Sequence, residues 1–82
     1  MPYIPVEDRK DASLCPVTVG ELTYALTAVV LRYLDALPSL PRFADFAEVM
    51  GALSATQQEF YRRVVAPYED KARDRNGEVY GV

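Results

Sequence analysis

The chain has 82 residues, a formal net charge of −3 and a single cysteine, Cys15. This length allows one domain, and we expect one small helical domain over residues 1–82. The negative charge argues against general binding to duplex nucleic acid, for which a basic domain is expected. One cysteine excludes an internal disulfide and fits a reducing cytoplasm. No segment reaches the ~20 apolar residues of a membrane span, so we expect no membrane partner.

Residues 1–17 are predicted to form an extended arm. Pro2, Pro5 and Pro16 each remove a backbone donor and disfavour helix at the residue before them. One short turn is predicted near residues 6–11. The apolar side chains of the arm, Tyr3, Ile4 and Val6, are expected to pack the arm against another surface.

The first long helix is predicted over residues 19–37. Thr18 and Glu21 have the spacing of a capping box, in which the hydroxyl caps a backbone N–H and the carboxylate reaches back. Apolar residues then recur at helical intervals as far as Leu37. The stretch "PSLPR" ends this helix and forms a linker.

The apolar face of this first helix is unusually wide. At about 100° per residue, apolar side chains sweep more than half of its circumference: Leu22, Tyr24, Ala25, Leu26, Val29, Val30, Leu31, Tyr33, Leu34 and Leu37. A helix that is apolar so far round is normally buried on several sides. We therefore expect a homo-oligomer, a dimer or a tetramer. The alternative is a monomer whose arm and tail wrap the helix.

The second long helix is predicted over residues 45–66. Asp45 and Glu48 repeat the spacing of a cap. Gly51 in its interior costs about 1 kcal/mol relative to alanine, which indicates the close approach of another backbone. Gln57 falls in the centre of the apolar face. A buried amide needs partners, so we expect it to pair with a threonine of the first helix or with its own symmetry mate, the alternative being a ligand.

The chain should kink or break at Pro67, which has no N–H for the carbonyl four residues earlier. A further helical segment is predicted from Pro67 to about Arg75. The dipeptide Asn76–Gly77 is a good helix stop. The helical core thus spans residues 18–76, and residues 77–82 form a short tail.

The residue types present argue against catalysis. The chain has no histidine, the commonest general base and metal ligand, and no glycine-rich phosphate loop. Its C-terminal carboxylates alternate with arginines, which is typical of surface ion pairs. We therefore predict no enzyme, no catalytic residue, no metal and no cofactor. A phosphohydrolase with a metal held by carboxylates alone is the weakest alternative.

Basic and aromatic residues gather in the segment "YRRVVAPYEDKARDRNG". Arginine holds phosphate bidentately and stacks on flat rings, and tyrosine offers a ring face or a hydroxyl. A nucleotide needs both features. The alternative is that Arg62 and Arg63 form ion pairs with Glu59, Glu69 or a neighbouring subunit, and that the mixed charges after Pro67 are a solvated face.

Several segments resemble a family of small proteins from phages and bacteria. They are "MPYI", "GELTYALT", "EFYRRVVAPYEDK" and "NGEVY". The resemblance covers both ends and both long helices. It departs before Gly20, where that family has a longer first helix and this chain has only "DASLCPVTV", so any role of a first helix is in doubt.

The chain is also similar in size and composition to phage proteins that sequester the cyclic nucleotides of bacterial immunity, the anti-CBASS and anti-Thoeris sponges. The similarity implies an oligomer that binds a cyclic di- or trinucleotide between subunits without hydrolysis, in the host cytoplasm if the protein is phage-encoded. The ligand-binding residues would be Tyr3, Tyr24, Thr27, Tyr61, Arg62, Arg63, Tyr68, Lys71 and Arg75. The alternative function is a protein–protein interaction module or an inhibitor of a host protein, without a small-molecule ligand.

Overall fold

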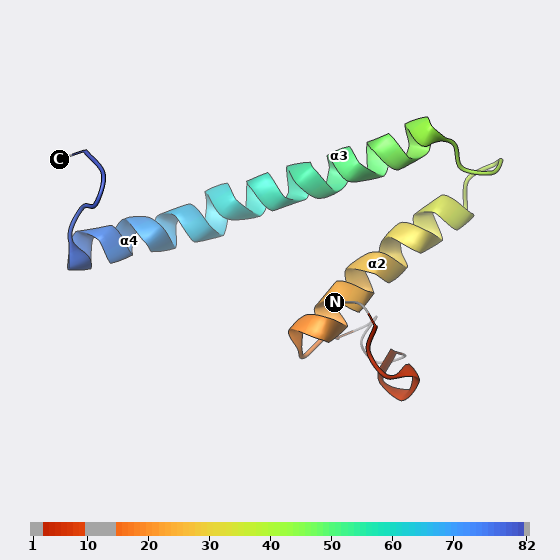
Figure 1. The fold of residues 1–82 in the computed structure, drawn as a ribbon, viewed down its shortest axis with the longest axis horizontal. Coiled ribbons are helices and arrows are strands. Elements are labelled where there is room, and N and C mark those ends of the chain that lie inside the picture. Colours follow the sequence, from red (N-terminus) through yellow and green to blue (C-terminus); the bar gives the residue numbers. More distant parts are fainter. Residues whose placement is uncertain (1–2, 10–14, 82) are drawn as a thin grey trace. The chain divides into compact units, whose positions relative to one another are not determined.

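The computed structural model describes residues 3–9 and 15–81. Within these ranges the chain is helical and has no strand, as predicted (Figure 1). The elements are a 3₁₀ turn η1 (Val6–Asp8), helices α2 (Val19–Asp35) and α3 (Phe43–Phe60), a π-helical turn η2 (Tyr61–Val65) and helix α4 (Ala66–Asn76).

The chain divides into two units, Met1–Phe46 and Ala47–Val82. The single domain over residues 1–82 stays a prediction. No helix among the described residues is both long enough and apolar enough to span a membrane.

The arm contains the predicted short turn as η1, whose Asp8 N–H donates to the Pro5 carbonyl at 3.0 Å. The predicted end of this turn, at Asp11, lies outside the described residues. Tyr3 and Val6 are 81% and 74% exposed in the isolated chain, so the packing of these two side chains stays a prediction.

Helix α2 begins with the predicted capping interaction. The Glu21 N–H donates to the Thr18 hydroxyl at 3.1 Å, which satisfies one of the free donors of the first turn. The Glu21 carboxylate accepts from the backbone N–H of Val17 at 3.0 Å, one residue earlier than in the usual capping box. The reciprocal arrangement fixes the first turn of the helix.

The end of α2 comes two residues earlier than predicted. Helix α2 ends at Asp35, and the Leu37 N–H bonds the Leu34 carbonyl at 3.3 Å, three residues back. Leu37 precedes Pro38, whose ring disfavours the α conformation for the residue before it. The last turn therefore tightens before the chain leaves the helix.

The start of α3 is also displaced. Helix α3 begins at Phe43 rather than Asp45. The Asp45 carboxylate accepts from the backbone N–H of Arg42 at 2.9 Å, so it reaches back from the first turn instead of capping from outside. Aspartate is favourable in both places, because both lie at the positive end of the helix dipole. The spacing of Asp45 and Glu48 alone did not distinguish an aspartate at the N-cap from one in the first turn.

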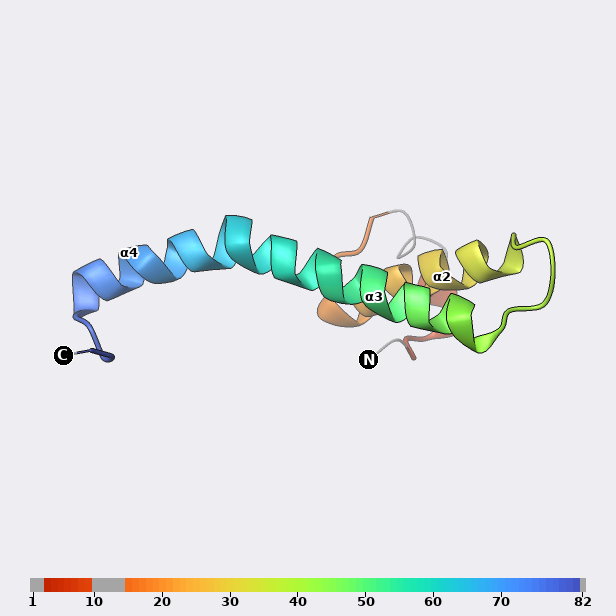
Figure 2. The same ribbon diagram turned by 90° about the horizontal axis from the view of Figure 1, so that it is seen from above.

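The helical segment predicted after Pro67 is present, and of the two outcomes predicted at this proline, a kink or a break, the break does not occur. Elements α3, η2 and α4 follow one another without a loop (Figures 1 and 2). The Ala66 N–H donates to the Tyr61 carbonyl, five residues earlier, which is the π-helical bond. In an α-helix the ring of Pro67 would press on the carbonyl of Arg63. The wider turn makes room for the ring, and Pro67 then sits in the first turn of α4, where no N–H is required.

The C-terminal stop is at the predicted place. Helix α4 ends at Asn76, and Gly77 takes φ 100° and ψ 152° while its N–H bonds the Arg73 carbonyl at 2.8 Å. Only glycine adopts this backbone region without strain. The sequence position of the glycine therefore sets the length of α4.

Gly51 has free space around it within its own unit. A Cβ atom built there meets nothing within 4 Å among the described residues outside the local helix. The approach of another backbone, from the other unit or from a second subunit, stays a prediction. In the isolated chain, Gly51 carries the cost of glycine in a helix interior.

We predict that Gly51→Ala stabilises the protein by about 1 kcal/mol, because alanine favours the helix and has free space here. Thermal or urea unfolding followed by circular dichroism measures this change. Gly77→Ala is the matched control, and it should destabilise the protein because of its positive φ. A loss of stability in Gly51→Ala would mean that a neighbour packs against this position.

Candidate functional site

The nine predicted ligand residues fall on both units. Tyr61, Arg62 and Arg63 form the first three residues of the π turn η2, whereas Tyr68, Lys71 and Arg75 lie on α4. Tyr24 and Thr27 lie on α2, and Tyr3 precedes η1. The structure thus brings the first six together along one helical run. Their grouping with the other three stays a prediction.

The two consecutive arginines share one acidic neighbour. Both oxygens of Glu59 accept from Arg62 Nη2 at 2.9 Å, and Arg63 Nη1 lies 4.0 Å from Glu59 Oε1. The arginine side chains are 68% and 69% exposed. The ion-pair interpretation of Arg62 is therefore correct in the isolated chain. Exposed pairs of this kind contribute only about 0–1 kcal/mol, so an anion can compete with Glu59.

Tyr61 faces a shallow depression that the C-terminal tail helps to form. Its lining also includes Arg73 and Tyr80, together with carboxylates of α4 and the tail. Within the tail, Glu78 Oε1 accepts from the N–H groups of Val79 and Tyr80 at 2.9 Å, and Glu78 Oε2 lies 3.9 Å from Arg73 Nε of α4. Two tyrosines and an arginine thus line the same depression.

Arg73 balances several of the acidic side chains around this depression. Its guanidinium lies 3.7–3.9 Å from carboxylate oxygens of Asp70, Asp74 and Glu78. The mixed charges of α4 therefore form surface ion pairs, as the solvated-face interpretation holds. Arg73 was not among the predicted ligand residues, because its acidic neighbours in the sequence balance its charge.

The remaining cationic candidates of α4 are more open. Lys71 and Arg75 are exposed, and Tyr68 is 66% exposed. Within the described part of the chain, no carboxylate comes within ion-pair distance of Lys71 or Arg75. These two charges are available to an anion without the loss of an existing pair.

Tyr24 has a partner that the sequence did not indicate. The Cζ atom of Arg9 lies 5.7 Å from the centroid of the Tyr24 ring, within the range of a cation–π contact. Arg9 Nε donates to the Ile4 carbonyl at 3.0 Å. Arg9 therefore ties the arm to α2. No periodicity relates residue 9 to residue 24, so only the structure could find this contact.

The hydroxyls of Thr27 and Thr23 bond within their own helix. They donate at 2.8 Å to the carbonyls of Thr23 and Val19, respectively. Gln57 is exposed in the isolated chain. Its pairing with a threonine of α2 or with its own symmetry mate stays a prediction, as does the ligand contact of Thr27. Tyr3, another predicted ligand residue, is largely exposed.

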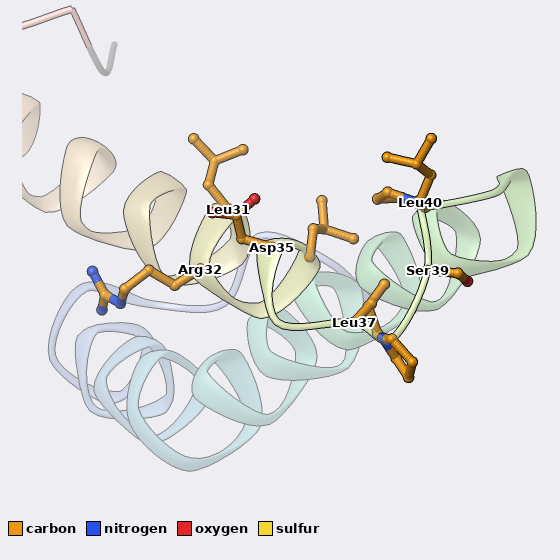
Figure 3. Close-up of a pocket in the computed structure, with 9 residues that line it drawn as sticks. Leu31, Arg32, Asp35, Leu37, Ser39 and Leu40 are labelled. Atoms are coloured by element: carbon orange, nitrogen blue, oxygen red, sulfur yellow. The ribbon is translucent and has the colours of Figure 1, made fainter.

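A larger depression lies elsewhere, at the end of α2 and the start of the linker (Figure 3). Its volume is about 740 Å³, and Leu31, Leu37 and Leu40 are among its lining residues. Figure 3 shows the Arg32 side chain directed away from Leu37 and Leu40. None of the nine candidate residues lines it. Its mostly apolar wall offers no cluster of groups for a phosphate.

We predict that Arg9→Ala lowers the free energy of unfolding by about 0.5–1 kcal/mol, the usual value of an exposed cation–π contact. Hydrogen exchange of the arm should become faster in the same variant, because Arg9 joins the arm to Tyr24. Arg32→Ala, which removes the same charge from α2, is the control. Unchanged exchange in the arm of Arg9→Ala would contradict the role of this contact.

The comparisons with known proteins identify a family but no activity. Residues 1–79 match a domain of unknown function, DUF6899. No curated protein and no solved structure matches the chain. The family match covers both units and every candidate residue described above. The chain therefore belongs to the DUF6899 family.

Proposed function

We propose that this protein binds a cyclic oligonucleotide and sequesters it without hydrolysis. In this proposal the protein is a cytoplasmic homo-oligomer, phage-encoded and directed against nucleotide-based immunity such as CBASS. The observation that supports it best is the π turn η2, which presents Tyr61, Arg62 and Arg63 in sequence with exposed side chains. Single π turns within α-helices are frequent at functional sites.

The chemistry of this segment suits a ligand with both phosphates and bases. Guanidinium groups bind phosphate oxygens bidentately, and the exposed rings of Tyr61 and Tyr68 offer faces for base stacking. Lys71 and Arg75 add positive charge one to three turns further along the same helical run. Binding and sequestration require no general base, metal or nucleophile.

Self-association is part of this proposal. Large apolar side chains remain exposed on both units, among them Leu26 at 50%, Val29 at 53% and Phe60 at 58%. Exposed apolar surface of this extent marks an interaction site. Further copies of the chain would cover it and would complete a ligand site between subunits.

A stripe on α2 favours the second candidate, a protein–protein interaction module or inhibitor of a host protein. The exposed side chains follow alternating steps of three and four residues: Val19, Leu22, Leu26, Val29 and Tyr33. Such a stripe can dock a foreign amphipathic helix. A host protein bound at fixed stoichiometry, and lost in Leu26→Lys, would favour this function over the nucleotide.

Native mass spectrometry with a panel of cyclic di- and trinucleotides tests the proposed function. We expect a ligand mass that is retained unchanged, at a fixed number per oligomer. An oligomer that retains no ligand would contradict the proposal, and loss of the ligand mass by hydrolysis in the presence of magnesium would indicate an enzyme instead.

Single substitutions locate the site. We predict that Arg62→Ala or Arg63→Ala weakens binding about 10- to 100-fold, the equivalent of the 1.5–3 kcal/mol of a hydrogen bond to a charged group, and leaves the oligomer intact. Glu59→Gln should strengthen binding, because it frees Arg62 from its present partner. Titration calorimetry measures both effects, with Arg32→Ala as the charge-matched control. Dissociation of the oligomer in the arginine variants would show that these residues are structural.

A further inference from the structure

A second stripe of side chains follows the helical run of the second unit. Met50, Leu53, Gln57, Phe60 and Val64 succeed one another at steps of three, four, three and four residues. The four apolar members are 42–67% exposed, and Gln57 is exposed as well. This alternation is the spacing of the inner positions of a coiled coil. The stripe, named here the α3 seam, is therefore shaped to receive another helix.

The seam lies within one long helical run. Elements α3, η2 and α4 extend without interruption from Phe43 to Asn76, about 50 Å at 1.5 Å per residue. The seam from Met50 to Val64 takes up about 21 Å of this length. A second copy of the run is long enough to lie along the whole seam. Helix α2, with 17 residues, is long enough as well, so length alone does not select the partner.

Gln57 indicates which helix that is. It is the one polar member of the α3 seam, and its side-chain amide carries both donors and acceptors. An amide enclosed by an apolar partner would lose its hydrogen bonds to water, whereas two facing glutamines can satisfy each other. A single polar residue at such a position is a known determinant of pairing in coiled coils. The side chain best suited to face Gln57 is therefore the Gln57 side chain of a second copy.

We infer that the α3 seam binds the α3 seam of a second copy of this chain, with Gln57 facing Gln57 across a two-fold axis. The neighbouring positions Ser54 and Thr56 are uncharged, so two copies approach without like-charge repulsion at the centre. The contact is isologous, as two-fold symmetry requires.

This inference rests on the self-association of the proposed function but not on its nucleotide. It places Arg63 beside the subunit contact, because Arg63 lies about 100° around the helix from Val64, whereas Arg62 lies about 200° from Phe60. An anion bound by Arg63 would therefore lie next to the second subunit.

Disulfide trapping tests the pairing in the full-length chain. The exposed Cys15 is first replaced, as Cys15→Ser. In that background Gln57→Cys should oxidise to a covalent dimer, because facing positions of this kind bring Cα atoms within the 4.4–6.8 Å that a disulfide spans. Ala55→Cys, about 200° away around the helix, is the matched control and should stay monomeric on a denaturing gel. Failure of Gln57→Cys to cross-link, or equal cross-linking of Ala55→Cys, would overturn the inference.

A second pair of variants measures the oligomer without a cysteine. Leu53→Lys places a charge in the seam and should reduce the mass seen by native mass spectrometry by half or more, whereas Ala55→Lys should not. A monomeric wild-type protein, or an unchanged mass in a helical Leu53→Lys variant, would also overturn the inference. Should Leu53→Lys fail to fold, the cross-linking result decides. Nucleotide binding is scored separately, so a dimer through Gln57 that binds no nucleotide would refute the proposed function alone.

Discussion

The missing N–H of Pro67 determines the form of the helical run that holds most of the candidate residues. A proline within an α-helix removes a hydrogen bond and presses on the carbonyl four residues earlier. Here the preceding turn widens, and the Ala66 N–H reaches the Tyr61 carbonyl instead. The run therefore continues to Asn76. The same widening places Tyr61, Arg62 and Arg63 in a turn whose backbone differs from that of the flanking helices, so a constraint from one proline sets the geometry of the proposed site.

The charge pattern of this site depends on local partners. Glu59 holds Arg62 at 2.9 Å, and Arg73 lies among three carboxylates, so much of the positive charge seen in the sequence is already balanced. Of the basic candidate residues, Lys71 and Arg75 form no ion pair within the described part of the chain. A ligand at the proposed site would exchange one weak surface pair for bonds to phosphate.

Local sequence signals predicted the elements well, and longer-range contacts poorly. The Thr18 cap and the Gly77 stop were found because each depends on a few adjacent residues. The end of α2 was missed by two residues, since the effect of Pro38 on Leu37 outweighed the apolar periodicity. The helix after Pro67 was predicted, but the π turn that accommodates this proline was not, because side-chain spacing does not reveal such a change in the backbone. For the site, the sequence predicted the Arg–Tyr segment, and this assignment stays a prediction. It could not find the contact of Arg9 with Tyr24, because nothing in a linear pattern relates an arm to a helix face.

The threonines within the helices have one more consequence. Thr23, Thr27 and Thr56 each donate a hydroxyl proton to the carbonyl of the preceding turn, at 2.8 Å. A hydroxyl engaged in this way is turned back onto the helix, and the γ-methyl group is the part of the side chain left to meet a neighbour. In contact with another surface each of these threonines acts much as a valine does. The helix surfaces are therefore more apolar than the residue types indicate. A hydropathy scale applied to the sequence underestimates their tendency to bind other surfaces.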